Sequence, residues 1–433
     1  MDLLTANDAI GTYPNSYYAA TARPLEPFAP LAGSERCDVC VVGGGFMGLS
    51  TALHLAKAGY DVVLLDAQRV GFGASGRNGG QVGQGQRVEQ DELETMLGLD
   101  HARALWKLAN QSVDLVRDLS ADPRVEATFH PGIIHADHRP RYVRHSQAYA
   151  EKLNSEYGYD QIRFVDQEEM RQLVNSPVYY GGTLDMGAGH IHPLAFAFGL
   201  ARMARDAGVR ILEQSKVTAM TDGARVQVMT AGGQVDAQHV VLGCNGYLGD
   251  LAPKVAAKVM PINNYVVATR PLDPVAQEAV IRNNLAVADS KFVVNYFRFS
   301  DDHRLLFGGT ESYGYRFPQD IARAVRRPMR EIFPQLSEVE IDYAWGGTLG
   351  ITMNRMPHFE RLSGNIMSLS GFSGHGVAMA TLAGQIAAEL VAGQAERFDI
   401  FAKIPMASFP GGPRLRSPLL VAAMLWYALR DRI

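Results

Sequence analysis

The glycines Gly43, Gly45 and Gly48 have the G-x-G-x-x-G spacing that allows a backbone to approach a pyrophosphate closely. In this pattern the first glycine permits a tight turn, the second leaves room for the phosphates, and the third lets a helix pack against a strand. Asp66, 18 residues beyond Gly48, could accept hydrogen bonds from a ribose diol. Because its carboxylate would repel a 2′-phosphate, the pattern predicts FAD or NAD as the ligand rather than NADP.

A βαβ unit over residues 37–66 is expected to position these groups. The valine-rich run at 37–42 predicts a buried strand, and four apolar residues between 49 and 56 recur with helical spacing after the glycines. A second apolar run, 61–66, ends at Asp66. The phosphates would therefore meet a helix N-terminus, whose free N–H groups and partial positive charge favour anions.

A second glycine-rich run, residues 71–85, contains seven glycines in fifteen positions. It suggests a backbone laid against a flat ligand, and Ser75, Arg77 and Asn78 could reach phosphate or ring edges. A third glycine turn, 371–376, joins a predicted strand to a helix. The N–H groups at that helix start could stabilise the negative charge of a reduced isoalloxazine. These two runs favour FAD over NAD.

The rest of the chain alternates between helical and strand patterns. Residues 1–36 are expected to be irregular because four prolines interrupt them. From 259 to 351 the pattern is rich in strands, which predicts a mostly antiparallel sheet inserted into the α/β part. Helices are predicted over 92–119, 140–157, 193–207, 320–332 and 377–391, and short strands over 209–212, 217–220, 226–230, 239–242 and 366–369.

The composition excludes several classes of protein. The 433 residues carry 41 Lys and Arg against 45 Asp and Glu, a net charge of −4, without the basic stripe that nucleic-acid binding needs. Three cysteines fit a reducing compartment, and residues 1–10 lack the basic region of a signal peptide, so a cytoplasmic location is expected. The apolar stretch 418–429 is too short to span a bilayer. It predicts a terminal helix docked on the body, with contact to a membrane surface as the lesser alternative.

Several segments resemble those of the D-amino-acid-oxidase-type family of FAD amine oxidoreductases. The resemblance rests on VVGGGFMGLSTALHLAKAGYDVVLLDA, GFGASGRNGGQ, GHIHP at 189–193 and SGFSGHG at 370–376, and it extends from residue 16 to 431. Within the family the sequence is most similar to the gamma-glutamylputrescine oxidoreductase group. The matching segments are SYYAAT (16–21), LDMGAGHIHP (184–193), YFRFS (296–300), LLFGGT (305–310) and WGGTLGITMNRMP (345–357).

The resemblance implies an α/β fold with a Rossmann-like FAD-binding domain of the GR2, D-amino-acid-oxidase type. A substrate domain made of a mostly antiparallel β-sheet would be inserted into this FAD-binding domain and would cover the flavin. The expected division is an N-terminal lead-in (1–36), a discontinuous FAD-binding domain (37–85, 160–258 and 352–410), a substrate domain (86–159 and 259–351) and a C-terminal helix (411–433).

The same resemblance implies oxidation of a C–N bond in a small-molecule amine, such as a gamma-glutamylputrescine-like amine. A hydride would pass to flavin N5, water would hydrolyse the imine to an aldehyde or oxo product, and O2 would reoxidise the flavin and give H2O2. Alternatives within the family are an L-pipecolate, glycine, sarcosine or D-amino acid oxidase or dehydrogenase. An NAD-dependent dehydrogenase and a non-catalytic flavin-binding or RNA-modifying component are the other classes considered.

The chain departs from the family pattern at two positions. Sarcosine-oxidase-type members carry a lysine shortly after the GHG turn, where this chain has Val377 and Ala378. They carry another lysine near the flavin, where this chain has Leu-Leu-Phe at 305–307. These differences weaken the case for sarcosine and leave oxidase versus dehydrogenase open. FAD is expected to be non-covalent, because 73–80 has no His or Cys and 345–355 has no Cys.

The resemblance and the motifs together give two groups of site residues. Those expected to bind FAD are Gly43, Gly45, Phe46, Met47, Gly48, Asp66, Ala67, Gly73, Ala74, Ser75, Arg77, Asn78, Gly79, Gly80, Val217, Cys244, Asn245, Gly246, Gly347, Leu349, Gly371, Ser373, Gly374, His375 and Gly376. Those expected to line the substrate pocket are Gln81, Tyr265, Tyr296, Arg298, Trp345 and His375.

Aromatic faces in the second group could hold a cationic or alkyl amine, and Arg298 could bind a carboxylate. His375 lies in the third glycine turn and is expected to position the cofactor. No catalytic residue is assigned, because binding and orientation do most of the work in such a reaction. The histidine pairs 135/138 and 190/192 lack supporting ligands, so no metal site is predicted.

Overall fold

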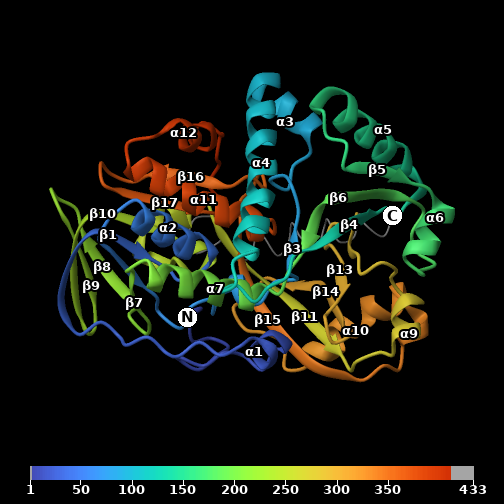
Figure 1. The fold of residues 1–433 in the computed structure, drawn as a ribbon, viewed down its shortest axis with the longest axis horizontal. Coiled ribbons are helices and arrows are strands. Elements are labelled where there is room, and N and C mark those ends of the chain that lie inside the picture. Colours follow the sequence, from blue (N-terminus) through green and yellow to red (C-terminus); the bar gives the residue numbers. More distant parts are fainter. Residues whose placement is uncertain (1, 411–433) are drawn as a thin grey trace.

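The computed structural model describes residues 2–410 and contains two β-sheets that lie side by side, with α4 standing between them in the view of Figure 1. The helices are α1 (Tyr17–Thr21), α2 (Phe46–Lys57), α3 (Gln90–Leu97), α4 (Leu99–Ser120), α5 (Pro140–Tyr157), α6 (Gln167–Leu173), α7 (Pro193–Asp206), α8 (Pro253–Ala256), α9 (Pro274–Glu278), α10 (Ile321–Ile332), α11 (Gly376–Val391) and α12 (Glu396–Ala402). Across residues 2–410, none of these helices is long and apolar enough to cross a membrane.

The first sheet contains the βαβ unit predicted for residues 37–66. β1 pairs in parallel with β2 and with β10, and α2 supplies the crossover between β1 and β2 that parallel strands require. The strand order is β16-β17-β10-β1-β2-β7, and the β8–β9 hairpin joins through β9 to β10. The strands are β1 (Gly33–Val42), β2 (Val62–Leu65), β7 (Arg210–Leu212), β8 (Val217–Thr221), β9 (Val226–Thr230), β10 (Gly233–Leu242), β16 (His358–Arg361) and β17 (Ile366–Ser370).

Both faces of this first sheet are buried. Val39 and Val41 of β1 pack with apolar residues of α2, α7 and α11, whereas Cys40 and Val42 pack with the β8–β9 hairpin and the segment 248–259. Successive residues of a strand point to opposite faces, so a sheet covered on both sides needs an unbroken apolar run. That requirement explains the apolar sequence of β1.

The second sheet is mostly antiparallel, as predicted. Its order is β15-β11-β14-β13-β12-β4-β6-β3, with β5 paired to β6, and within residues 2–410 its one parallel pair is β12 with β4. Helix α10 covers one face. The strands are β3 (Gln81–Val82), β4 (His130–Ala136), β5 (Ile162–Val165), β6 (Gly182–His190), β11 (Met260–Thr269), β12 (Ala286–Asp289), β13 (Tyr296–Phe299), β14 (Leu305–Ser312) and β15 (Ile341–Ile351).

The two faces of the second sheet have different partners. Val266 and Ala268 of β11 belong to the same apolar cluster as α2, α7 and α11, so this face is turned toward the first sheet and its helices. Tyr265 and Val267 belong instead to the cluster that packs under α10. We refer to these as the inner face and the outer face of the second sheet.

The structure confirms the predicted fold class and differs from the sequence analysis in three details. The helix predicted over 92–119 is broken at Gly98, whose φ of +85° is a conformation that glycine adopts readily. β5 and β6 pair with the second sheet, so residues 162–190 lie with that sheet although we assigned them to the FAD-binding domain. The lead-in contains α1 and the first residues of β1. The predicted C-terminal helix lies outside the described residues.

Helix α2 is held in place by α11 through a close contact at Gly384. A Cβ at Gly384 would lie 2.5 Å from the Met47 carbonyl oxygen and 2.6 Å from Ser50 Cβ. The Ser50 hydroxyl also donates a 2.7 Å hydrogen bond to the Thr381 carbonyl oxygen. The position of α2 therefore depends on the absence of a side chain on α11.

We expect Gly384→Ala to destabilise the protein by about 1–3 kcal/mol, because the added methyl group overfills a packed helix contact. The control is Gly364→Ala, where the new Cβ would meet nothing within 4 Å. Thermal and denaturant unfolding of the two variants would measure the difference. Equal stability of the two variants would contradict the close α2–α11 contact.

Candidate active site

The turn between β1 and α2 requires glycine for two different reasons. Gly43 has a φ of +111°, and a Cβ there would lie 2.8 Å from the Gly243 carbonyl oxygen. A Cβ at Gly48 would overlap the Gly43 carbonyl oxygen. The start of α2 is thereby brought against the end of β1, as the G-x-G-x-x-G spacing predicts.

Asp66 fixes the same turn from the end of β2. Its Oδ2 accepts a 2.6 Å hydrogen bond from the Gly44 N–H, and its Oδ1 accepts a 2.7 Å bond from the Gln68 N–H. Burial raises the pKa of the Asp66 carboxyl to about 6, against the lowering effect of these two N–H groups. Each oxygen can still accept a further hydrogen bond, as binding of a ribose diol requires.

The second glycine run lies directly against this turn. The Ser75 hydroxyl oxygen accepts a 3.0 Å hydrogen bond from the Phe46 N–H, and a Cβ at Gly45 would lie 2.8 Å from that oxygen. A cavity of about 140 Å³ runs between the two segments. Among the predicted cofactor residues it is lined by Gly43, Gly45, Asp66, Ala67, Gly73, Ala74, Ser75, Val217, Cys244 and Asn245. Sequence reasoning missed Gln68, Lys216 and Tyr247, which also line it.

Arg77 and Asn78 are engaged mainly with the protein itself. The Arg77 guanidinium donates to the Phe72 carbonyl oxygen at 2.7 Å and to Asp8 at 2.9 Å, while its Nη2 has no partner among the described residues. The Asn78 amide donates to two carbonyl oxygens of the preceding turn and accepts from the Gly80 N–H. Both side chains therefore shape the 71–85 loop, and their direct contact with a cofactor stays a prediction.

Predicted cofactor residues from three further segments of the chain lie close together. Asn245 Oδ1 accepts a 2.9 Å hydrogen bond from the Gly371 N–H. A Cβ at Gly246 would lie 3.1 Å from the Leu349 carbonyl oxygen, and one at Gly347 would lie 3.0 Å from Arg77 Cβ. The segments 245–246, 347–349 and 371–376, far apart in sequence, thus lie side by side.

Three of the predicted substrate residues hold the 71–85 loop from the inner face of the second sheet. Arg298 is 4% exposed and donates to the carbonyl oxygens of Gly79 at 2.8 Å and Ile191 at 2.9 Å. The Tyr296 ring packs on Gly79, and Trp345 Nε1 donates to the Arg77 carbonyl oxygen at 3.0 Å. These contacts favour a positioning role for the three side chains.

The other predicted substrate residues are separated from one another. Tyr265 lies on the outer face, where its hydroxyl is 2.5 Å from Ser312 Oγ and its ring packs on Phe317. Gln81 donates a 2.8 Å hydrogen bond to the Val287 carbonyl oxygen. The structure therefore does not bring Tyr265 together with Tyr296, although both had been predicted for one pocket.

A group of ionisable side chains gathers where the third glycine turn meets the second sheet. Burial, with the charges of Arg87 and His135, lowers the pKa of His375 to about 3. Neighbouring protein groups and the charge of Arg87 lower the pKa of His135, although the residue remains exposed to solvent. Burial raises the pKa of Glu311, and the charge of Arg355, a hydrogen bond from the Tyr313 hydroxyl and the charge of Arg87 oppose this effect in decreasing order. Both histidines are therefore neutral at pH 7. The Arg87 guanidinium and the Glu311 carboxyl group are close enough for each charge to shift the pKa of the other group.

The sequence analysis does not predict Arg87 or Glu311 as site residues. It mentions His135 only with His138, as a histidine pair that lacks further metal ligands. The three come from separate segments, so no motif connects them. Glu311 could have been noticed as the acidic residue at the end of an otherwise apolar predicted strand. Within residues 2–410, no group of three or more His, Cys, Asp or Glu side chains could hold a metal ion.

The geometry fits a flavin dinucleotide. The glycine turn cannot accommodate side chains at Gly43 and Gly48, the helix N-terminus faces a narrow cavity, and His375 Nδ1 is buried without a partner within residues 2–410. The family model described as FAD dependent oxidoreductase matches residues 38–390. The chain therefore belongs to this family of flavoenzymes, which includes amine and amino-acid oxidases.

Curated relatives match over nearly the whole chain. The gamma-glutamylputrescine oxidoreductase of Escherichia coli is 42% identical, with 97% of this chain and 98% of the relative covered. A probable oxidoreductase OrdL of Rhizobium meliloti is 41% identical, with 96% and 97% covered.

Solved structures share the fold at low sequence identity. Glycine oxidase from Geobacillus kaustophilus matches with a TM-score of 0.70 and 20% identity, covering 83% of this chain and 95% of that one. L-proline dehydrogenase from P. horikoshii matches with a TM-score of 0.69 and 21% identity, covering 87% and 96%. These matches confirm the architecture of two sheets.

We expect FAD affinity to be constant above neutral pH and to fall below pH 6. Because the pKa of Asp66 is about 6, the carboxylate that would accept ribose hydrogen bonds is lost by protonation as the pH drops through that value. Asp66→Asn should weaken binding by about 10–100-fold at pH 8 and flatten the pH dependence. Flavin fluorescence titration of the deflavinated protein measures both effects.

The matched control is Asp61→Asn, at the opposite end of the same strand, where the side chain is 54% exposed. It should leave FAD affinity unchanged. An Asp66→Asn protein that binds FAD as tightly as the parent would contradict the assigned role.

Proposed function

We propose that this protein oxidises the C–N bond of an amine that also carries a carboxylate, with a gamma-glutamylated polyamine such as gamma-glutamylputrescine as the leading substrate. The observation that carries the proposal is the 42% identity to a gamma-glutamylputrescine oxidoreductase over 97% of the chain. The charge of Arg87 reaches His375 in the third glycine turn, and Arg87 and Glu311 act on each other's pKa, which supports a substrate with charged groups of both signs.

When bound, FAD supplies a two-electron acceptor that takes the hydrogen of the C–H bond next to the amine nitrogen as a hydride. Loss of the hydride leaves an iminium ion, which releases a proton to give the imine, and water hydrolyses the imine to an aldehyde and ammonia. We propose O2 as the final electron acceptor, which yields H2O2. No protein nucleophile is needed, so the chain contributes mainly by binding and orienting the amine.

In this proposal two side chains orient the substrate by charge. The Glu311 carboxylate would bind an ammonium group, and the Arg87 guanidinium would bind a carboxylate. His375, neutral at pH 7 because its pKa is low, could accept or donate a hydrogen bond at the flavin turn. Arg298 is less suited to a carboxylate, since backbone carbonyl oxygens already accept from its guanidinium.

An anaerobic titration tests the proposal directly. The flavin absorbance of the purified protein is followed as gamma-glutamylputrescine, putrescine, glycine, sarcosine, L-pipecolate, L-proline and D-alanine are added, and air is then admitted. We expect bleaching with gamma-glutamylputrescine, slower bleaching with the others, and H2O2 on admission of air. Bleaching by an amino acid in preference to the gamma-glutamylated amine would contradict the proposed substrate, and bleaching without H2O2 would contradict O2 as acceptor.

We expect Glu311→Gln to raise KM for gamma-glutamylputrescine by about 10–100-fold, the effect of losing one charge-assisted hydrogen bond, with a smaller change in kcat. The control is Glu340→Gln, whose side chain is 73% exposed and paired with Arg270. Steady-state kinetics of both variants measure the difference. An equal change of KM in the two variants would contradict the proposal that Glu311 binds the substrate.

A further inference from the structure

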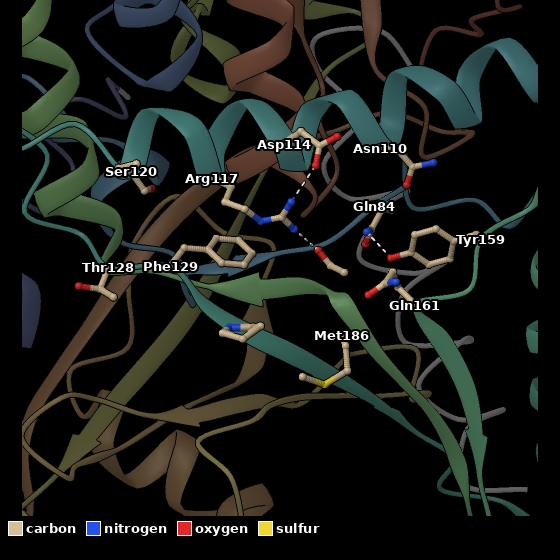
Figure 2. Close-up of a pocket in the computed structure, with 13 residues that line it drawn as sticks. Gln84, Asn110, Asp114, Arg117, Ser120, Thr128, Phe129, Tyr159, Gln161 and Met186 are labelled. Carbon is tan, nitrogen blue, oxygen red and sulfur yellow. Dashed lines mark hydrogen bonds and ion pairs between the residues drawn. The ribbon is translucent and has the colours of Figure 1, made fainter.

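The open cavity between helix α4 and the strands β4 and β6 has a volume of about 750 Å³, in the usual range for small-molecule sites (Figure 2). Among the described residues that line it, the charged ones are Asp114 and Arg117. Figure 2 shows that Arg117 donates to Asp114, at 2.8 Å, and to the Gly187 carbonyl oxygen, also at 2.8 Å. Because these charges satisfy each other, neither is left to select a ligand.

The wall of the dinucleotide cavity, in contrast, includes a residue from the N-terminal segment. Leu4 lines this cavity, whereas its other lining residues lie within 42–45, 65–75, 215–217 and 243–251. The N-terminal segment therefore closes one side of a cavity that is otherwise formed by the first sheet and its connections.

The Gln68 side chain holds this segment at two points. Its Nε2 donates a 2.6 Å hydrogen bond to the Leu4 carbonyl oxygen, and its Oε1 accepts a 2.6 Å hydrogen bond from the Gly11 N–H. Gln68 is 1% exposed, and its own N–H donates to Asp66 Oδ1 at 2.7 Å. Residues 4–11 thus form a surface loop whose ends are fixed to one buried side chain, an arrangement common in functional loops. We call residues 4–11 the N-terminal clasp.

The middle of the N-terminal clasp is bound to the second sheet and to the second glycine run. Asn7 Nδ2 donates to the Tyr315 carbonyl oxygen at 2.8 Å, and Asn7 Oδ1 accepts from the Phe317 N–H at 2.8 Å. Both partners lie in the segment that follows β14. Asp8 accepts a 2.9 Å hydrogen bond from Arg77, which belongs to the second glycine run. The clasp therefore connects both parts of the protein that meet at the cofactor cavity.

The two ends of the clasp are anchored to different degrees. Beyond its C-terminal end, the Tyr13 hydroxyl donates a 2.7 Å hydrogen bond to the Val70 carbonyl oxygen. Before its N-terminal end, Asp2 pairs with Lys216, but these side chains are 42% and 52% exposed, and exposed ion pairs contribute little stability. Gly11, with a φ of +72°, lies next to the firmer anchor. The clasp can therefore open about Gly11 while Tyr13 stays in place.

All these contacts are made within the chain, so the clasp closes whether or not a cofactor is bound. A cofactor can then enter or leave only in the fraction of molecules whose clasp is open. Loosening the clasp should therefore speed entry and exit alike. Loss of a contact with the bound cofactor would instead speed exit alone.

We propose that the N-terminal clasp covers the cofactor cavity and must open for FAD to enter or leave, with Gln68 as the positioning residue that holds it closed. Such a clasp would help the chain to retain FAD without a covalent bond. This inference rests on FAD as the cofactor and does not depend on which amine is oxidised.

The test measures both rates of FAD exchange. Association is followed by flavin fluorescence after rapid mixing of the deflavinated protein with FAD, and dissociation by the reverse change after dilution of the holoprotein. We expect Asn7→Ala and Gln68→Leu each to raise both rate constants about tenfold, the effect of losing two hydrogen bonds. Asn7 is not among the residues that line the cavity, so its substitution acts through the clasp.

The matched control is Asn154→Ala. Asn154 also makes two hydrogen bonds to the main chain, from its Nδ2 to the carbonyl oxygens of Ala150 at 2.7 Å and Ile162 at 3.0 Å, but it lies on α5 and does not line the cavity. We expect both rate constants to stay unchanged in this variant. Asn7→Ala keeps the test valid if Gln68→Leu does not fold.

Three results would overturn the proposal. Unchanged rate constants in Asn7→Ala would show that the clasp does not control FAD exchange. Faster dissociation with unchanged association would show that residues 4–11 only stabilise the bound state. Equal effects of Asn7→Ala and Asn154→Ala would show a general loss of stability instead of an opened clasp.

Discussion

The site depends on the contact between Gly48 and the Gly43 carbonyl group. No side chain fits between them, so α2 starts directly at the end of β1 and presents its N-terminal N–H groups to the cavity. Asp66 then fixes the intervening Gly44 N–H, and Ser75 fixes the Phe46 N–H. A turn that is held from two directions is preorganised for a dinucleotide, because little ordering remains to be done on binding.

The second sheet completes the site by holding the 71–85 loop rather than by forming a separate pocket wall. Arg298 and Trp345 bond to backbone carbonyl groups of this loop, and Tyr296 packs on it. A glycine-rich loop has high conformational entropy, so such contacts are needed to keep it in one conformation. The first sheet therefore supplies the glycine turn that would bind the dinucleotide, and the second sheet positions the loop and carries Glu311 and His135.

The local features could be predicted from the sequence because short-range chemistry determines them. The G-x-G-x-x-G turn, the strand-helix-strand unit and the position of Asp66 at the end of β2 follow from spacing alone. The pairing of β6 with β4 could not be predicted, since it joins distant segments. Residues alternate regularly along β11, so Tyr265 shares the outer face with Val267, and which of the two faces meets α10 is decided only by the packing of the whole sheet. The group of ionisable side chains around Arg87 could not be predicted either, because its members come from separate segments that only folding brings together.

The flavin content of the purified protein shows whether the two sheets hold one FAD without a covalent bond. The protein is denatured, the precipitate is removed, and the flavin in the supernatant is identified and quantified against the protein. The structure predicts an equimolar amount of FAD in the supernatant. A colourless protein, or flavin that stays with the precipitated chain, would contradict the account.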